Sequence, residues 1–365
     1  MHLAIASRTA ITNALGPAAL TTLEPLFERY LAAARDGGTD ARLLMIDDAS
    51  SMETFGLEPL GLASAELVRT VVANVRKQAR QALESLLLLG GHSMFPLFAF
   101  TNPVLDRLLD PDAVVESDNP YGVLDTVSSG ADWLAPSIPV GRIYDSGSVD
   151  AFAQALSAVI ARHEAKPARA GSLAIYNADW MDVSLDVARN LPGPVDSVMA
   201  PPYEVGDNVK DLEREVLYVN LHGFSGVPGW QSYDSITDRF IDVLTPRSFT
   251  PETSSGTFLL TETCYGAQVV GRTPQNSCAL SAHTNGATVV GATGLVWGSV
   301  LKPWAFVADG DALAQCVFQH LNRGGLIGAA FKAGRDAFLA GRTLNPFEQK
   351  TALQFILLGD PSLPV

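Results

Sequence analysis

The sequence predicts an α/β protein whose central sheet is mostly parallel. Short apolar runs rich in Val, Leu and Phe alternate with segments of helical spacing, a pattern typical of strands buried between helices. The chain has 365 residues, of which 47% are hydrophobic and 18% are charged. This length and composition fit one large core or two fused α/β halves, and they exclude a disordered chain.

The first half is expected to begin with an apolar, helical lead-in over residues 1–42. Within it, residues 20–35 have helical spacing, and a Gly-Gly pair at 37–38 ends that helix. The elements expected next are a strand at 41–48, a helix at 64–84, strands at 85–91 and 95–100, an irregular surface excursion at 101–137, a strand at 137–143 and a helix at 149–165.

Residues 166–171, KPARAG, are basic and rich in turn-forming types. They are the expected boundary between an N-terminal subdomain, 1–168, and a C-terminal subdomain, 169–365. Strands alternate with helices in the second half, which favours a doubly wound parallel sheet. Its expected elements are strands at 172–177, 216–224, 257–267 and 288–294, and helices near 182–191, 233–243, 276–285, 309–322, 325–340 and 346–355.

Two of these apolar runs end in a reactive side chain. VLYVNLHGF at 216–224 contains His222, and TFLLTETCYGA at 257–267 contains Cys264. Because residues just past the carboxyl ends of parallel strands meet at the ligand crevice, neighbouring strands would place the imidazole beside the thiol. A nucleophilic cysteine needs this arrangement, since the thiolate attacks while the histidine handles the proton. The helix at 233–243 is expected to be the crossover between the two strands.

The residue after the histidine strengthens this interpretation. Gly223 lets backbone approach a substrate carbonyl, and its N–H and that of Cys264 are predicted to stabilise an oxyanion. The alternatives are a buried structural cysteine at Cys264 and a satisfied structural histidine at His222. Cys278 and Cys316 lie within helical patterns and are expected to be inert core residues.

A hydrophobic block ending in His-Gly, followed by one ending in an acidic residue, a small residue and Cys, resembles the caspase-like clan of cysteine peptidases. Within that clan the sequence is most similar to the gingipain catalytic domain, from about residue 85 onward. The resemblance implies a three-layer α-β-α sandwich and a cysteine endopeptidase in which His222 and Cys264 form a dyad. Besides the His and Cys blocks, the similar segments are LLLLGGHSMFPLF at 86–98, ESDNPYG at 116–122, PVGRI at 139–143, SLAIYNAD at 172–179, ATVVGATGLVW at 287–297 and LLGDPSL at 357–363.

The resemblance also implies a residue that orients the histidine. In gingipains an acidic residue after the strand matching 172–177 does so, and Asp179 corresponds to it. A carboxylate there would fix the imidazole tautomer and stabilise the imidazolium. An ordinary loop or helix N-cap aspartate is the alternative for Asp179.

Three further residues are expected to shape the pocket for the residue before the scissile bond, P1. Glu262 shares a strand face with Cys264, and in metacaspases and gingipains an acidic residue at this position goes with pockets for Arg or Lys. Legumains share the acidic residue and prefer Asn. Asp182 is the expected second acidic wall, and Trp297 matches an aromatic position of the gingipain pocket, with core packing as its alternative.

No cofactor is expected from the sequence. It lacks the dinucleotide, Walker A, G-x-S-x-G and H-E-x-x-H patterns, and its six histidines and three cysteines are too scattered for a zinc site. Calcium occurs in the gingipain family, and the acidic stretch 105–118 is where this chain would bind it.

The net charge of −14 disfavours nucleic acid and anionic membranes as partners. No apolar run is long enough for a membrane span, and the N-terminus lacks the features of a signal peptide. Because three distant cysteines do not form a disulfide framework, a cytoplasmic location is expected, unlike that of the secreted gingipains.

The function predicted from these observations is cleavage of protein or peptide substrates, with a preference for Arg or Lys at P1. An activating or substrate-delivering protein partner is a further expectation. One alternative is a regulatory or adaptor module that retains the fold without catalysis. Another is a cysteine-dependent hydrolase or acyltransferase that acts on non-peptide substrates.

Overall fold

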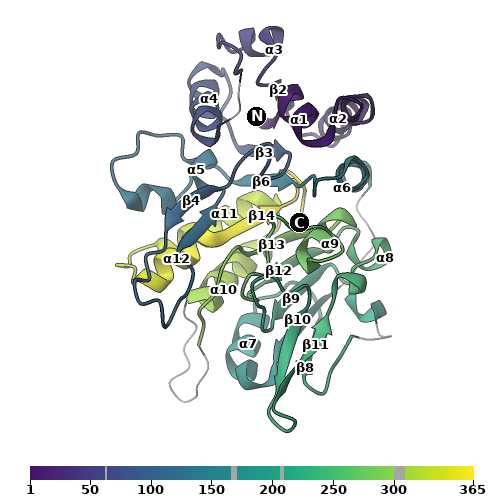
Figure 1. Ribbon diagram of the computed structural model, residues 1–365, viewed down its shortest axis with the longest axis vertical. Coiled ribbons are helices and arrows are strands. Elements are labelled where there is room, and N and C mark those ends of the chain that lie inside the picture. Colours follow the sequence, from purple (N-terminus) through teal and green to yellow (C-terminus); the bar gives the residue numbers. More distant parts are fainter. Residues whose placement is uncertain (62–63, 166–170, 206–208, 300–308) are drawn as a thin grey trace.

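The computed structural model describes residues 1–61, 64–165, 171–205, 209–299 and 309–365 (Figure 1). Its centre is a ten-stranded sheet in the order β2-β1-β3-β6-β14-β13-β12-β9-β7-β8. Among the described strands of this sheet, β13 and β14 pair antiparallel and the other neighbours pair parallel. The predicted α/β class with a mostly parallel sheet is therefore confirmed.

The strands of the large sheet are short, and all except the edge strands β2 and β8 are wholly buried, as expected for strands covered on both faces. They are β1 His2–Ala6, β2 Ala41–Met45, β3 Ser85–Leu89, β6 Val140–Ile143, β7 Ser172–Asn177, β8 Val195–Ala200, β9 Val216–Asn220, β12 Phe258–Thr261, β13 Thr288–Ala292 and β14 Phe355–Leu358. Two small antiparallel sheets pair β4 Phe98–Thr101 with β5 Val114–Ser117, and β10 Trp230–Asp234 with β11 Arg239–Leu244.

Helices cover both faces of the sheet. In Figure 1, α2, α6 and α9 lie on one side, whereas α4, α7, α10 and α12 lie on the other. Polar caps mark several starts: Ser148 accepts from the N–H of Ala151 at the start of α6, and Asn345 and Glu348 form a capping box on α12. The helices are α1 Arg8–Leu15, α2 Ala19–Asp36, α3 Ala49–Glu53, α4 Ala65–Gln78, α5 Asn119–Gly122, α6 Val149–Glu164, α7 Met181–Ala188, α8 Pro251–Ser254, α9 Cys278–Thr284, α10 Asp309–Leu321, α11 Ile327–Leu339 and α12 Pro346–Gln354.

The alternation of side chains along β9 shows how the layers are held. Val216 and Tyr218 belong to the core cluster that includes Phe318 of α10, and the Tyr218 and Phe318 rings are 5.6 Å apart. Leu217 and Val219 face the other way, into the cluster packed against α9. Successive strand residues point to opposite faces, so both helix layers are fixed by one strand.

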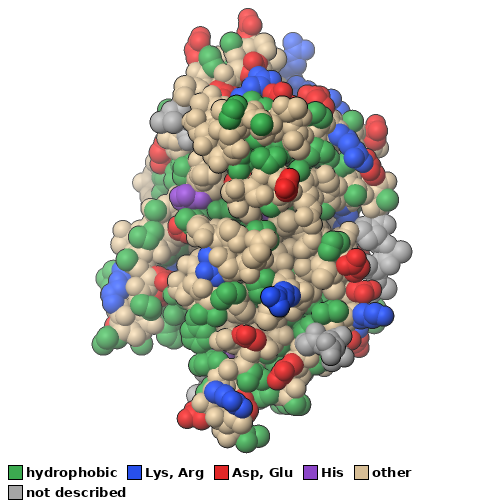
Figure 2. All heavy atoms as spheres, turned by 45° about the vertical axis from the view of Figure 1, so that its right-hand side comes forward, with side chains coloured by type: hydrophobic (Ala, Val, Ile, Leu, Met, Phe, Trp, Pro, Cys, Tyr) green, Lys and Arg blue, Asp and Glu red, His purple; other side chains and the backbone are tan. Residues whose placement is uncertain are grey.

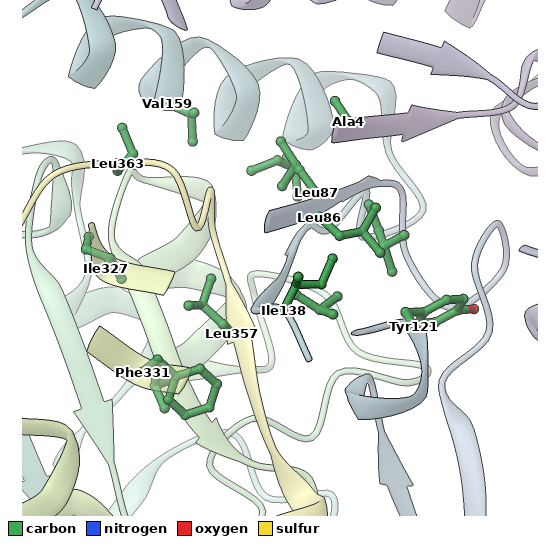
Figure 3. Close-up of a cluster of buried hydrophobic side chains, with 14 of the residues drawn as sticks. Ala4, Leu86, Leu87, Tyr121, Ile138, Val159, Ile327, Phe331, Leu357 and Leu363 are labelled. Atoms are coloured by element: carbon green, nitrogen blue, oxygen red, sulfur yellow. The ribbon is translucent and has the colours of Figure 1, made fainter. Parts of the chain in front are cut away.

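The last strand of the chain lies in the middle of the sheet. β14 pairs with β13 along its length and meets β6 through one register pair, Leu358 with Arg142. Figure 3 shows Leu357 of β14 in one cluster with Leu86 of β3 and Phe331 of α11. The core and the sheet thus run across the predicted division at 168 and 169, which stays a prediction because residues 166–170 lie outside the described part.

The expected crossover helix at 233–243 is wrong. Residues 230–244 form the hairpin of β10 and β11, and the connection from β9 to β12 continues through a 3-10 turn at Pro246–Ser248 and the short α8. Buried Trp230 and Ser232 alternate with more exposed residues, which is a strand period. The hairpin turn includes Asp238 at φ 52°, a left-handed conformation that ends any helical pattern.

Two predictions in the first half also need correction. The lead-in at 1–42 contains β1, which five buried residues form between β2 and β3, and a run this short cannot be distinguished from a helical one by periodicity. The excursion at 101–137 contains β5 and α5 and buries Asn102, Asp110 and Ser117, because its polar side chains bond to each other and to α12. Helix α4 ends at Gln78, earlier than predicted, and β8 and β14 were not expected as strands.

On the face seen in Figure 2, basic and acidic side chains are scattered between apolar ones, and no continuous basic area stands out among the described residues. None of the described helices combines the length and apolar character that crossing a bilayer requires. One cavity beside β9, β12 and β13 is lined by buried polar side chains, among them Asn220, Glu262 and Asp311.

Candidate active site

A cavity of about 310 Å³ opens beyond the carboxyl ends of β9 and β12. This is where the parallel-sheet argument predicts a site. The strands bring Asn220 and Glu262 to it, and the segment after β13 forms one wall. The lining residues are Leu109, Trp180, Asn220, Leu221, Glu262, Cys264, Leu295, Val296, Trp297, Gly298, Ser299 and Asp311.

Cys264 presents a half-buried thiol to this cavity. Its Sγ lies 3.4 Å from the amide nitrogen and 3.5 Å from the carbonyl oxygen of Val296. Burial raises the pKa of the Cys264 thiol, although the Val296 N–H and the charge of Lys350 oppose the rise. The thiol is therefore protonated at neutral pH and needs a base before it can attack.

His222 follows β9 and is fixed through its backbone. It exchanges two hydrogen bonds with Gln231 of β10, of 2.7 and 2.8 Å, which anchors the histidine to the hairpin. Its ring centroid lies 4.3 Å from that of Trp180 and 5.0 Å from that of Phe240. Burial lowers the pKa of His222, and the Asp179 carboxylate opposes this. The imidazole is neutral near pH 7 and can accept a proton.

The backbones that carry these two side chains touch. A Cβ on Gly223 would clash with the carbonyl oxygen of Cys264 and the side chain of Thr263, so only glycine fits beside the cysteine. Within the described ranges, the His222 ring makes no hydrogen bond to the Cys264 Sγ. Among the described residues, neither the Gly223 N–H nor the Cys264 N–H donates to another residue.

Two acidic side chains are buried together in the cavity. Glu262 is 5% exposed, Asp311 of α10 is 1% exposed, and the Oε1 of Glu262 has no hydrogen-bond partner among the described groups. The Ser299 N–H donates to Asp311 at 2.8 Å. Burial and the neighbouring Asp311 raise the pKa of Glu262 well above its usual range, and burial raises that of Asp311 to about 6.

The family of the chain follows from its sequence. The model of peptidase family C25 matches residues 10–365. The chain belongs to peptidase family C25. A comparison with curated proteins gave no match. As predicted, this C25 peptidase is a cysteine-type endopeptidase that acts on protein or peptide substrates.

Solved structures share the fold of this C25 peptidase. The Arg-specific cysteine proteinase gingipain R matches with a TM-score of 0.68 and 11% identity, over 100% of this chain and 78% of that chain. The complex of Porphyromonas gingivalis RgpB pro- and mature domains matches with 0.65 and 11%, over 99% and 79%. A structure described as a protease matches with 0.63 and 14%, over 99% and 78%. The predicted resemblance to gingipains and the caspase-like sandwich are confirmed.

Of the remaining predicted site residues, Trp297 lines the cavity, whereas Asp179 and Asp182 do not. Trp297 lines it and packs against Phe347 with ring centroids 5.0 Å apart, while its Nε1 is buried without a partner in the described part of the chain. Asp179 is exposed and makes no hydrogen bond to His222 among the described atoms; its neighbour Trp180 makes the ring contact. The cavity lining does not include Asp182, one residue into α7.

Asp311 is the acidic wall that sequence reasoning missed. It lies in the sequence DGD at 309–311, which resembles an ordinary acidic helix start, and only tertiary packing brings it to Glu262. Glycine at Gly298 and Gly310 permits this packing, since a Cβ there would approach the Asp311 and Glu262 carboxylates at 2.6 and 3.1 Å.

The acidic stretch 105–118 does not fit a calcium ion. Its Asp110 and Asp112 carboxylates are bound to Lys350 Nζ, which takes the place of a cation. No cluster of three or more metal-ligating side chains occurs among the residues described. Cys278 is buried and contacts the carbonyl oxygen of Pro228 at 3.3 Å, and Cys316 is half-buried. Both lie outside the cavity lining.

Proposed function

We propose that this C25 peptidase cleaves the peptide bond after Arg or Lys, with Cys264 as nucleophile and His222 as base and acid. One observation carries the proposal: a single cavity holds the Cys264 thiol and the buried carboxylates of Glu262 and Asp311. Gingipain R, which shares the fold, is an Arg-specific cysteine proteinase, and its specificity points the same way.

In the proposed reaction, neutral His222 takes the Sγ proton and the thiolate of Cys264 attacks the scissile carbonyl carbon. The N–H groups of Gly223 and Cys264 hold the resulting oxyanion. His222 then gives its proton to the leaving amine, and a thioester remains on Cys264. Water, deprotonated by His222, attacks the thioester, which releases the acid and returns the proton to the thiolate.

The cavity supplies what a long cationic side chain requires. Leu221, Leu295 and Trp297 line it with apolar surface for the aliphatic part of Arg or Lys. The carboxylates of Glu262 and Asp311 can bind the terminal charge through short charge-assisted hydrogen bonds. Two adjacent buried acids cannot both ionise without compensation, and a guanidinium or ammonium group provides it. Asp311 takes the role predicted for Asp182.

We also propose roles for residues and partners around the site. Asp179 acts on His222 through its charge, while the rings of Trp180 and Phe240 orient the imidazole. A protein partner or a processing step is proposed to control access, as a complex of pro- and mature domains exists for RgpB. A cytoplasmic location stays part of the proposal, and fractionation of cells that express the protein tests it.

Fluorogenic peptides with Arg, Lys, Asn or Asp at P1 test the proposed function. We expect cleavage after Arg and Lys and loss of about 1,000-fold or more of kcat/KM in Cys264→Ala. Cys316→Ala is the matched control, because that thiol lies on α10 outside the cavity lining, and it should retain wild-type activity.

Other outcomes would separate the alternatives. Equal cleavage by wild type and Cys264→Ala contradicts the mechanism. Cleavage after Asn or Asp keeps the nucleophile and contradicts the pocket assignment. Turnover of activated esters without cleavage of any peptide favours a hydrolase or acyltransferase of non-peptide substrates. Silence towards all substrates, before and after limited proteolysis, favours a regulatory module.

A further inference from the structure

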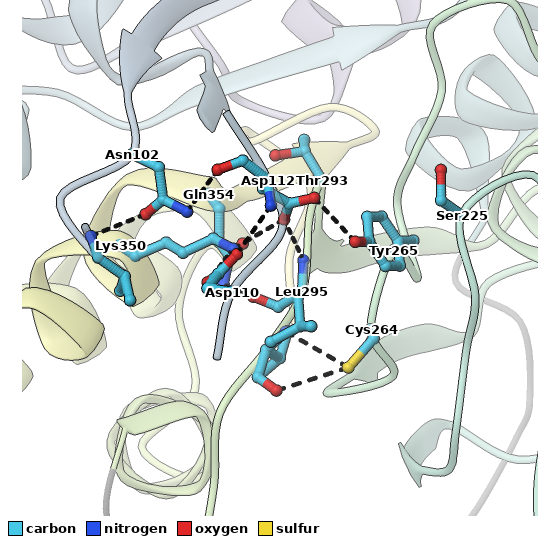
Figure 4. A network of polar contacts seen from close by, with 12 residues as sticks. Asn102, Asp110, Asp112, Ser225, Cys264, Tyr265, Thr293, Leu295, Lys350 and Gln354 are labelled. Atoms are coloured by element: carbon cyan, nitrogen blue, oxygen red, sulfur yellow. Dashed lines mark hydrogen bonds and ion pairs between the residues drawn. The ribbon is translucent and has the colours of Figure 1, made fainter. Parts of the chain in front are cut away.

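The loop between β4 and β5 belongs to the first half of the chain and contacts the segment that carries Cys264. Figure 4 shows its Asp110 and Asp112 between Lys350 of α12 and Tyr265. The loop is held in shape by its own polar groups: Asn102 Nδ2 donates to the carbonyl of Asp112 at 2.9 Å. The position of the two carboxylates is therefore set before they meet the site.

A single ammonium group binds both carboxylates. Lys350 Nζ lies 2.6 Å from an Asp110 oxygen and 2.7 Å from an Asp112 oxygen. The Lys350 and Asp110 side chains are 1% and 0% exposed, and that of Asp112 is 14% exposed. One positive charge cannot fully compensate two carboxylates, so further donors are needed at one of them.

Asp112, and not Asp110, accepts hydrogen bonds from two further donors. The Oδ1 of Asp112 accepts from the Tyr265 hydroxyl at 2.8 Å, and the Oδ2 of Asp112 accepts from the Leu295 N–H at 2.8 Å. Burial raises the pKa of Asp112, but the bonds from Lys350, Leu295 and Tyr265 outweigh it and leave the pKa below the usual value. Asp112 is thus a fixed anion with three donors from three segments.

Two of those donors adjoin the nucleophile. Tyr265 directly follows Cys264, has φ 55°, and donates its N–H to the Gly294 carbonyl at 2.8 Å. A left-handed conformation is costly for a residue with a side chain and persists only where its surroundings hold it. Leu295 precedes Val296, whose N–H and carbonyl contact the Cys264 Sγ.

The absence of a side chain at Gly294 allows the Asp112 carboxylate to lie close to the cavity wall formed by Leu295 and Val296. A Cβ on Gly294 would lie 2.6 Å from the Asp112 Oδ2, so a larger residue would displace the carboxylate. Asp112 therefore bonds to the residue after the nucleophile and, at the same time, to the wall segment that touches its sulfur.

We infer that Asp112 is a positioning residue for catalysis: through Tyr265 it orients Cys264, and through Leu295 it sets the wall of the P1 cavity. This inference rests on the proposed function. Lys350 keeps Asp112 ionised and anchors it to α12. A loop from the first half of the chain is in this way part of the catalytic apparatus of the second half.

Three variants separate positioning from simple support of the fold. Asp112→Asn exchanges one carboxylate oxygen for an amide nitrogen, which cannot accept the bonds that this oxygen accepts. Tyr265→Phe removes only the bond on the nucleophile side. Asp110→Asn is the matched control, because Asp110 shares the Lys350 partner and is more deeply buried; its Oδ1 accepts from the Asp112 N–H at 3.1 Å, but it bonds to neither Tyr265 nor Leu295. Each variant and the wild type are assayed at a temperature that lies the same number of degrees below the Tm of that protein.

The kinetic expectation is a split between kcat and KM for a peptide with Arg at P1. Asp112→Asn should lower kcat by about tenfold or more and raise KM, because both the nucleophile and the wall shift. Tyr265→Phe should lower kcat about threefold with KM within twofold. Asp110→Asn should keep both within twofold. Equal losses in Asp110→Asn and Asp112→Asn, or wild-type kcat in Asp112→Asn, would overturn the inference.

Hydrogen exchange provides a reading that needs no turnover. The amide protons of Leu295 and Val296, followed by mass spectrometry, should exchange about tenfold faster in Asp112→Asn and at the wild-type rate in Asp110→Asn. If no peptide is cleaved by any form, the proposed function fails while this measurement still tests the anchoring by Asp112. Unchanged exchange in Asp112→Asn would refute that anchoring.

Discussion

Asp360 and Glu262 are both carboxylates removed from solvent, and the protein treats them in opposite ways. Asp360, which follows β14, is 0% exposed and accepts from the Tyr30 hydroxyl and His163 Nε2, each at 2.8 Å, and from the N–H and hydroxyl of Ser362. Glu262 is 5% exposed, and its Oε1 has no partner among the described groups.

The pKa values of the two groups diverge accordingly. Burial raises the pKa of each, but at Asp360 the charge of His2 and the bonds from His163 and Ser362 outweigh burial and lower it. At Glu262 the neighbour is Asp311, another acid, and the pKa rises further. A satisfied buried carboxylate stabilises the fold, whereas an unsatisfied one in a cavity is suited to bind a charged ligand.

Among the variants that test this comparison, the largest effect on activity should come from Glu262→Gln. We expect kcat/KM for an Arg substrate to fall about 100-fold, since loss of one partner of a buried charge pair costs about 2–5 kcal/mol. The free energy of unfolding should not fall, because the variant removes an uncompensated acid. Glu116→Gln, on β5 outside the cavity lining, is the control for loss of a half-buried carboxylate. Wild-type kcat/KM in Glu262→Gln would remove Glu262 from the pocket.

Asp360→Asn should have the opposite effect, lowering the stability of the fold and leaving activity unchanged. Removing one partner from a buried charged network typically costs about 3–5 kcal/mol of unfolding free energy. Chemical denaturation should show this loss, while kcat of the folded fraction at low temperature stays at the wild-type value. Asp125→Asn, which breaks an exposed ion pair with Arg76, should change stability little. A stable Asp360→Asn would show that the network around Asp360 is dispensable.

The two regions should also respond to pH with opposite sign. Asp360 has a lowered pKa in the folded state, so its contribution is present above the unfolded pKa, about 4, and is lost as pH falls below it. Asp311 has a pKa raised to about 6, so between about pH 4 and 6 it is protonated in the folded state and ionised in the unfolded chain. Its contribution to stability therefore declines as pH rises from about 4 through about 6. The free energy of unfolding, measured by denaturation across pH, should fall less steeply below about pH 4 in Asp360→Asn than in wild type. In Asp311→Asn it should change less between about pH 4 and 6.

Deprotonation of the acid pair should favour a cationic P1 residue. The ratio of kcat/KM for Arg over its neutral analogue citrulline should rise about tenfold from pH 5 to 7, since the Asp311 carboxyl, with a pKa of about 6, then ionises and faces the substrate with a negative charge. The ratio cancels the titration of His222 and Cys264. Asp311→Asn should abolish the rise, and a ratio independent of pH in wild type would contradict the role of Asp311 in binding the P1 charge.

The smallest effect should come from Asp179→Asn. Asp179 is exposed and acts on His222 only through its charge, so we expect kcat/KM to fall no more than about fivefold. Trp180→Ala, which removes a ring against the imidazole, should cost more. A loss of 100-fold in Asp179→Asn would show that its carboxylate binds the imidazole directly during the reaction.

The site residues that directly follow apolar strands could be predicted from the sequence. β9 and β12 are apolar runs buried on both faces, and their carboxyl ends lead directly to His222 and Cys264. Residues that reach the cavity from distant segments could not. Asp311 and Asp112 lie in stretches typical of a helix start and a polar loop, and only the packing of α10 and α12 gives them a role.

The same limit explains the errors in the fold. The hairpin of β10 and β11 contains Asp, Ser and Thr among its apolar residues, and its spacing also fits a helix. β14 directly follows α12, so the pattern offers no turn to separate helix from strand. Its place between β6 and β13 is decided by long-range pairing, which periodicity does not encode.

The central position of β14 sets an order of events during synthesis. A ribosome releases the chain from its N-terminus, so β1, β2, β3 and β6 can pair with one another early, and β7, β9, β12 and β13 can do so later. The two groups become one sheet only when residues 355–358 arrive between them. Lys350, just ahead of that strand, arrives at almost the same moment. A nascent chain therefore carries its cysteine and histidine before β14 joins the two groups of strands.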